Sequence, residues 1–107
     1  AGALDNALGR AGIETEQRLA MVTNELSSEI QKLARDSSQA SQFIKLLEVR
    51  YLLRTAAIGL HFRQDISATV LLLERVLDQL DAVEGLALLP LKAQVKKDLA
   101  SLQQIEN

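Results

Sequence analysis

The sequence has no cysteine, a single proline and only three aromatic residues in 107. Without cysteine, disulfides, thiolate metal sites and cysteine nucleophiles are all excluded. A β-sandwich or barrel usually needs more aromatic, β-branched and turn-forming residues than this chain contains. No apolar run approaches the roughly 20 residues that a bilayer-spanning helix needs. Because 48% of the residues are hydrophobic and 24% are charged, we expect one globular helical domain.

The charge balance is nearly neutral, with 12 basic and 14 acidic residues and a formal net charge of −2. A nucleic-acid-binding domain usually carries a basic excess, so no nucleic acid is expected as a partner. The chain begins Ala1-Gly2, without methionine and without a recognisable signal peptide. We therefore expect a fragment of a longer protein.

Residues 1–35 predict a long helix with a narrow apolar seam. From Leu19 to Leu33 the apolar residues recur every three or four positions, which is typical of a coiled coil. Gly9 and Gly12 each weaken a helix by roughly 1 kcal/mol relative to alanine, so a firm helix is expected only from about Ile13. Such a seam is compatible with a homodimer through this first helix.

Residues 36–107 predict a helical domain. The polar residues 36–38 interrupt the first helix and are suited to cap the next, which runs over about 39–63. That second helix is apolar on most of its circumference, so we expect it to be buried between neighbours, with one polar stripe facing water. The stripe consists of Ser41, Lys45, Glu48, Thr55, Gly59 and Arg63.

Two further helices complete the predicted domain. Asp65 is a suitable N-cap for a helix over about 66–81, and the short turn before it favours an antiparallel hairpin with the second helix. After a break at Gly85, Pro90 starts a last helix that ends near Gln104. The fold class is therefore all-α, one structural unit of about four helices, with packing that resembles tetratricopeptide repeats.

The candidate binding site consists of three basic residues in the second helix. Arg50, Arg54 and His61 lie opposite the polar stripe and beside apolar residues, where an unpaired charge would be costly. One interpretation is salt bridging to acidic residues of a neighbouring helix. The other is a groove that binds anions such as carboxylates or phosphates. Residues 41–64 carry a local charge of +3 and residues 65–89 one of −4, so the two segments are complementary.

The residues predict no catalytic site, cofactor or metal centre within this chain. Gly9 and Gly12 lie inside a helical pattern with no strand before them, which is the wrong context for a nucleotide loop. His61 is the only histidine, whereas a metal site usually needs three or four converging ligands. Glu74, Asp78 and Asp81 have helical spacing and are interpreted as a solvated face.

Several short motifs resemble the HemX family. Residues 48–56, Glu-Val-Arg-Tyr-Leu-Leu-Arg-Thr-Ala, are similar to that family's AEYLLRLA segment. Residues 88–92, Leu-Leu-Pro-Leu-Lys, are similar to its LLPVR segment, and residues 97–100 to the helix that follows. The resemblance covers about residues 43–103. This chain departs from the family pattern at two positions. Arg50 stands where the family commonly has an acidic residue, and Gln64 stands where the family commonly has arginine.

The resemblance implies a membrane-anchored protein with a coiled coil and a helical domain on the periplasmic side of the inner membrane. The anchor would lie upstream of this chain, and protein partners in a membrane complex would be expected. HemX genes occur with those of tetrapyrrole synthesis, and the family is often labelled uroporphyrin-III C-methyltransferase. Three hypotheses follow: a non-catalytic interaction or scaffold domain, which we favour; a methyltransferase, which would bind S-adenosylmethionine; and a tetrapyrrole carrier that uses Arg50 and Arg54.

Overall fold

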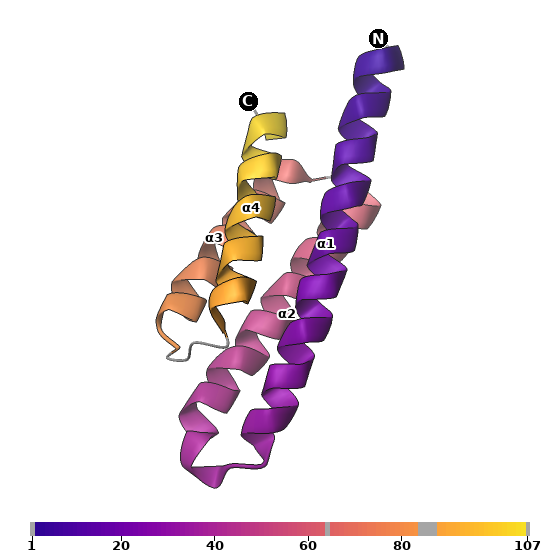
Figure 1. Ribbon diagram of the computed structural model, residues 1–107. Helices are drawn as coiled ribbons and strands as arrows, with labels where there is room; N and C mark the ends of the chain where they lie inside the picture. Colours follow the sequence, from indigo (N-terminus) through magenta and orange to yellow (C-terminus); the bar gives the residue numbers. More distant parts are fainter. Residues whose placement is uncertain (1, 64, 84–87, 107) are drawn as a thin grey trace.

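The computed structural model describes residues 2–63, 65–83 and 88–106, and these residues contain helices and no strand (Figure 1). The all-α prediction is therefore confirmed. In chain order, the described residues form four α-helices and one short 3-10 helix: α1 (Gly2–Ala34), η1 (Ser37–Gln39), α2 (Ala40–Arg63), α3 (Ile66–Asp81) and α4 (Leu89–Glu106).

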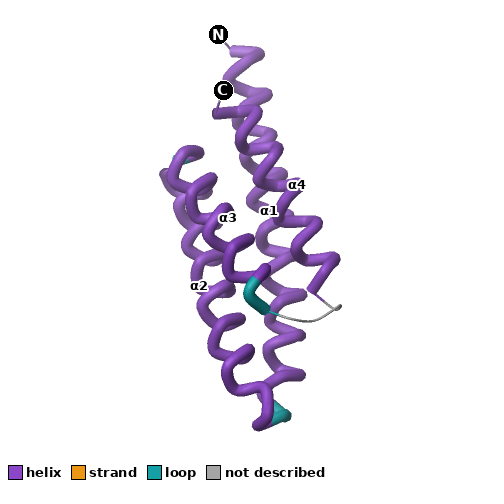
Figure 2. The backbone as a smooth tube through the Cα atoms, turned by 90° about the vertical axis from the view of Figure 1, so that its left-hand side faces the viewer, coloured by secondary structure: helices purple, strands orange, loops and turns teal. Residues whose placement is uncertain are grey.

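The four α-helices run alternately up and down and form an elongated bundle of 55 × 19 × 19 Å (Figure 1). Each helix contacts the next one along the chain, and α1 also contacts α4, which closes the bundle. The longer α1 and α2 continue past the α3–α4 end as a two-helix hairpin, which both views show (Figures 1 and 2). Helices in repeat stacks contact only their neighbours, so the predicted repeat-like packing is not confirmed.

The core follows the apolar periodicity of each helix. The seam predicted for α1 is buried, with Leu19, Val22, Leu26 and Ile30 all at most 4% exposed. Because these side chains pack against the rest of the same chain, the coiled-coil-like seam of α1 is used within the bundle. The other helices contribute a similar inner face: Leu46, Val49, Leu53 and Ala56 from α2, Leu73, Val76 and Leu80 from α3, and Leu91, Val95 and Leu102 from α4.

The helix ends agree with the predictions except at α1. The expected bounds of α3 are those observed, and Asp65 caps it by accepting a hydrogen bond from the backbone N–H of Ala68 at 3.0 Å. α1 extends back to Gly2, although a firm helix was expected only from Ile13. The residues around the two glycines are good helix formers, which offsets a local penalty of about 1 kcal/mol per glycine. The predicted break at Gly85 lies outside the described residues.

The prediction for the surface of α2 was wrong in one respect. The expected water-facing stripe is largely half-buried, since Lys45, Glu48, Thr55 and Gly59 are all partly covered. Glu48 lies at the boundary with α3, where its Oε1 accepts from Gln79 Nε2 at 3.4 Å. The side of α2 that is most open to solvent is apolar instead, because α2 occupies a corner of the bundle and has helices on only part of its circumference.

Candidate functional site

A buried ion pair joins the first helix to the last. Asp98 of α4 is completely buried, and its Oδ1 accepts from Arg18 Nε of α1 at 2.7 Å and from Gln94 Nε2 at 3.0 Å. Arg18 also donates from Nη2 to Thr15 Oγ1 at 3.1 Å. In the described part of the chain, Asp98 Oδ2 is buried without a hydrogen-bond partner. A buried carboxylate is costly unless paired, so Arg18 determines how α4 fits against α1.

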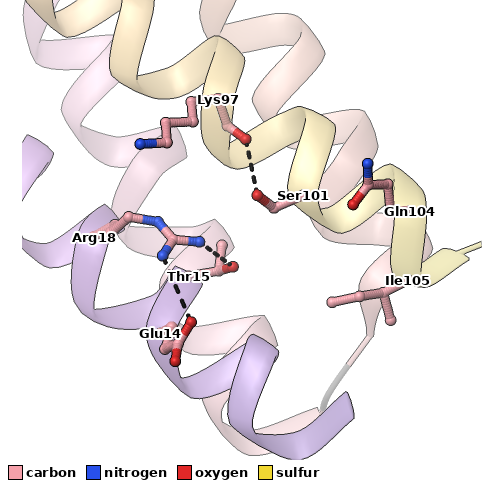
Figure 3. Close-up of a pocket in the computed structure, with 7 residues that line it drawn as sticks. All are labelled: Glu14, Thr15, Arg18, Lys97, Ser101, Gln104 and Ile105. Carbon is pink, nitrogen blue, oxygen red and sulfur yellow. Dashed lines mark hydrogen bonds and ion pairs between the residues drawn. The ribbon is translucent and has the colours of Figure 1, made fainter. Parts of the chain in front are cut away.

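A pocket of about 340 Å³ lies between α1 and α4, and Arg18 is among the residues that line it (Figure 3). Figure 3 shows Arg18 and Glu14 on α1 and Lys97 and Ser101 on α4 lying around the same space. The complete lining comprises Glu14, Thr15, Arg18, Lys97, Ser101, Gln104 and Ile105. The charges nearly cancel, because Arg18 is paired with Asp98 and lies 4.0 Å from Glu14. The pocket therefore has no strong preference for an anion or a cation.

An apolar row runs along the solvent side of α2, and we call it the α2 row. It consists of Ile44, Tyr51, Ile58 and Phe62, whose exposed fractions are 65, 68, 59 and 76%. The first three members are spaced seven residues apart and Phe62 follows four residues later. Positions seven or four apart lie on one side of an α-helix, so the row fills one position of each heptad along that side of α2. The row is thus an exposed apolar side of α2, and no other helix among the described residues covers it.

The predicted site residues lie on one edge of this row, and the structure does not bring them together around a pocket. His61 pairs with Glu16 of α1 through a 2.7 Å contact between Nδ1 and Oε1, which agrees with the salt-bridge interpretation for this residue. Arg50 is half-buried and Arg54 is exposed. Neither arginine forms an ion pair within residues 2–63, 65–83 and 88–106. The residues that line the α1–α4 pocket include none of the three.

Other cations around the α2 row are also unpaired. Lys45 and Arg63 form no ion pair with any described residue. The one acid of α2, Glu48, is already engaged by Arg75 of α3 at 3.5 Å. The surroundings of the row are consequently basic.

Among the described residues, no group of three or more histidine, aspartate or glutamate side chains is arranged to hold a metal ion. Nor does any described helix have the length and apolar character to cross a membrane. Three ion pairs link helices to one another: Arg18 to Asp98, His61 to Glu16, and Lys92 to Asp81 at 3.7 Å, in addition to the contact of Glu48 with Arg75. The notable surface of the described residues is therefore the α2 row.

Two features were missed from the sequence, although a signal was present for each. Asp98 falls between Val95 and Leu102 in the apolar stripe of α4, so its burial could have been expected from periodicity. The 7-7-4 spacing of the α2 row was also visible. Apolar residues on most of the circumference of this helix predict burial between neighbours, but the sequence does not show how many neighbours a helix has.

Comparisons with known proteins identify no relative. No family model, no curated protein and no solved structure matches this chain.

Proposed function

We propose that this chain is a non-catalytic helical interaction domain that binds a protein partner through the α2 row. The observation that carries the proposal is the exposure of four large apolar side chains in a line along one side of α2. Large apolar side chains scattered singly on a surface are common, whereas a contiguous apolar patch usually marks an interaction site. Such a row suits a partner helix, which would insert its own side chains between these residues.

The wider setting of the proposal comes from the resemblance to the HemX family. On that basis we place the domain on the periplasmic side of the inner membrane, in a protein anchored by a segment outside this chain. Its partners would then be proteins of tetrapyrrole synthesis or of the membrane around it. Partner capture from a membrane extract is thus the appropriate first experiment.

The experiment compares three forms of the chain immobilised on beads. The wild type is expected to retain specific partners, and Tyr51→Glu/Ile58→Glu to lose them, because two charges in the centre of the row would be desolvated by a partner helix. Met21→Glu is the matched control: Met21 is 58% exposed on α1 and lies outside the row. Circular dichroism establishes that all three are equally helical. Absence of any captured protein, or full capture by the row variant, would count against the proposal.

A tetrapyrrole carrier is a second candidate, and one observation favours it. Arg50 and Arg54 lie one helical turn apart on the same edge of α2, and neither has an ion-pair partner among the described residues. Arginine pairs well with carboxylates such as the acid side chains of a porphyrin. Absorbance titration with a porphyrin tests this candidate. Saturable binding that Arg50→Ala and Arg54→Ala weaken, but Lys96→Ala does not, would support it, and unchanged binding in both arginine variants would exclude it.

A further inference from the structure

We propose that two copies of this chain associate through their α2–α3 faces, so that α2 of each copy lies against α3 of the other. The inference rests on the proposed function, because it names a partner for the same α2 row. Four observations about the two helices lead to it: their charges, their small and apolar residues, their relative level, and their extent.

The charges on the two helices are complementary. The cations around the α2 row, among them Arg54, have no partner within the described chain, as shown above. On α3, Glu74 and Asp78 are exposed and likewise form no ion pair with a described residue. The chain thus displays an unpaired basic edge on one helix and an unpaired acidic edge on the next. A second copy supplies the opposite charge for both edges at once.

The side of α3 that would receive the row carries Leu71 and small residues next to two exposed charged residues, Arg75 and Asp78, which follow Leu71 by four and seven positions. Leu71 is 67% exposed, Ala68 lies three residues before it, and Ala82 is the C-cap that follows the helix. Ala68 and Leu71 fall on one side of the helix. Alanine permits close approach of a second helix, so the α2 row would pack beside Leu71 and Ala68, with the charged side chains flanking the contact.

The position of α2 along α3 also suits contact between Arg54 and Glu74 of two copies. The contacts of Glu48 with Arg75 and Gln79 fix how far α2 is shifted along α3. Because the two helices are antiparallel, moving six residues forward along α2 from Glu48 corresponds to moving six residues back along α3 from its contacts. Arg54 therefore lies level with the turn of α3 that holds Leu71 and Glu74. A two-fold axis parallel to the helices involves no shift along them. Each residue therefore keeps its level, and Arg54 of one copy comes within reach of Glu74 in the other.

The extent of the surface agrees with a modest dimer. A face two helices wide, about 20 Å, and about 24 Å long, the length of α3, has an outline of about 480 Å², which is smaller than the roughly 800 Å² per partner of a standard interface and predicts a weak dimer. Contact of α2 with α2 alone would bury about half of that area. It would also bring Arg50 and Arg54 close to the same cations of the second copy, with no free acid of α2 to separate them. Charge and area thus both favour the exchanged pairing of α2 with α3.

The test is sedimentation equilibrium of the purified chain with two charge-reversal variants. Wild type is expected to show a reversible monomer–dimer equilibrium. Arg54→Glu alone and Glu74→Arg alone should each weaken it roughly tenfold, because each creates like-charge contacts. An equimolar mixture of the two variants should restore dimerisation to the wild-type level. Each mixed dimer then contains one original Arg54–Glu74 pair and one pair in which both charges are reversed. Lys96→Glu, an exposed reversal on α4, serves as the control and should leave the equilibrium unchanged.

Three results would overturn the inference. A wild-type chain that remains monomeric at every concentration excludes it and leaves the capture experiment above as a separate test of the interaction domain. Dimers that Glu74→Arg does not affect and Arg54→Glu strengthens would indicate pairing of α2 with α2. A mixture that fails to restore association would show that Arg54 and Glu74 do not meet. Circular dichroism of each variant confirms that these surface changes leave the bundle folded.

Discussion

Arg18 and Asp98 are 80 positions apart in the sequence, and their side chains meet at 2.7 Å in the seam between α1 and α4. The pair joins the two helices that are most distant along the chain and so closes the bundle. Asp98 is completely buried, while the side chain of Arg18 is 26% exposed. A pair of this kind contributes specificity of packing more than stability, because both charges lose hydration when they are brought together.

We predict that breaking this pair costs more than removing it. Arg18→Met leaves the completely buried Asp98 carboxylate without its cation and should lower the free energy of unfolding by about 3 kcal/mol. The double variant Arg18→Met/Asp98→Leu replaces both charges with apolar groups and should be within about 1 kcal/mol of wild type. Urea unfolding of the purified chain measures both values. If the double variant were as unstable as the single one, the pair would be more stabilising than its buried setting predicts.

Periodicity predicted much of this fold because each helix has one inner face. The seam of α1 and the bounds of α3 were read from apolar spacing and from Asp65. The exposure of Tyr51 and Ile58 could not be read in the same way, since it depends on where α1 and α3 lie around α2. Asp98 was missed for a related reason: a carboxylate in an apolar stripe looks like an interruption until Arg18, far away in the sequence, is seen beside it.

The contrast between two neighbouring leucines of α3 gives a second prediction. Leu73 is completely buried in the core, whereas Leu71 is 67% exposed. Leu73→Ala should destabilise the chain by about 3 kcal/mol, because it removes buried methyl groups and leaves a cavity. Leu71→Ala, the matched control, should change the stability of the monomer by no more than about 0.5 kcal/mol. Chemical denaturation at low protein concentration keeps any self-association from contributing, and equal losses in the two variants would contradict the inner face assigned to α3.

The glycines of α1 lead to a third prediction. A methyl group added at Gly9 or Gly12 would meet no other atom within 4 Å. Alanine has a higher helix propensity and restricts the unfolded chain, so each substitution should stabilise the protein by about 0.5–1 kcal/mol. Thermal unfolding followed by circular dichroism should show a higher midpoint for Gly9→Ala/Gly12→Ala. No change in the midpoint would indicate that the first turns of α1 do not unfold together with the bundle.

The turn between α1 and α2 gives a prediction about pH. Asp36 Oδ1 accepts from Ser38 Oγ at 2.6 Å and from Ser38 N at 3.0 Å. These two bonds, the side-chain bond foremost, lower the pKa of Asp36 from its ordinary value of 3.8. Because the folded pKa is depressed, the carboxylate contributes stability at pH values above 3.8, and this contribution is lost as the pH falls through the folded pKa.

Ser38→Ala removes the larger of the two causes and should therefore lower the melting temperature at neutral pH. The gap between this variant and wild type should close as the solution is acidified below the ordinary pKa of 3.8, because protonated Asp36 no longer accepts these bonds strongly. Ser41→Ala, an exposed serine of α2, controls for the loss of a hydroxyl. A gap of constant size from neutral to acidic pH would mean that the charge of Asp36 does not stabilise this turn.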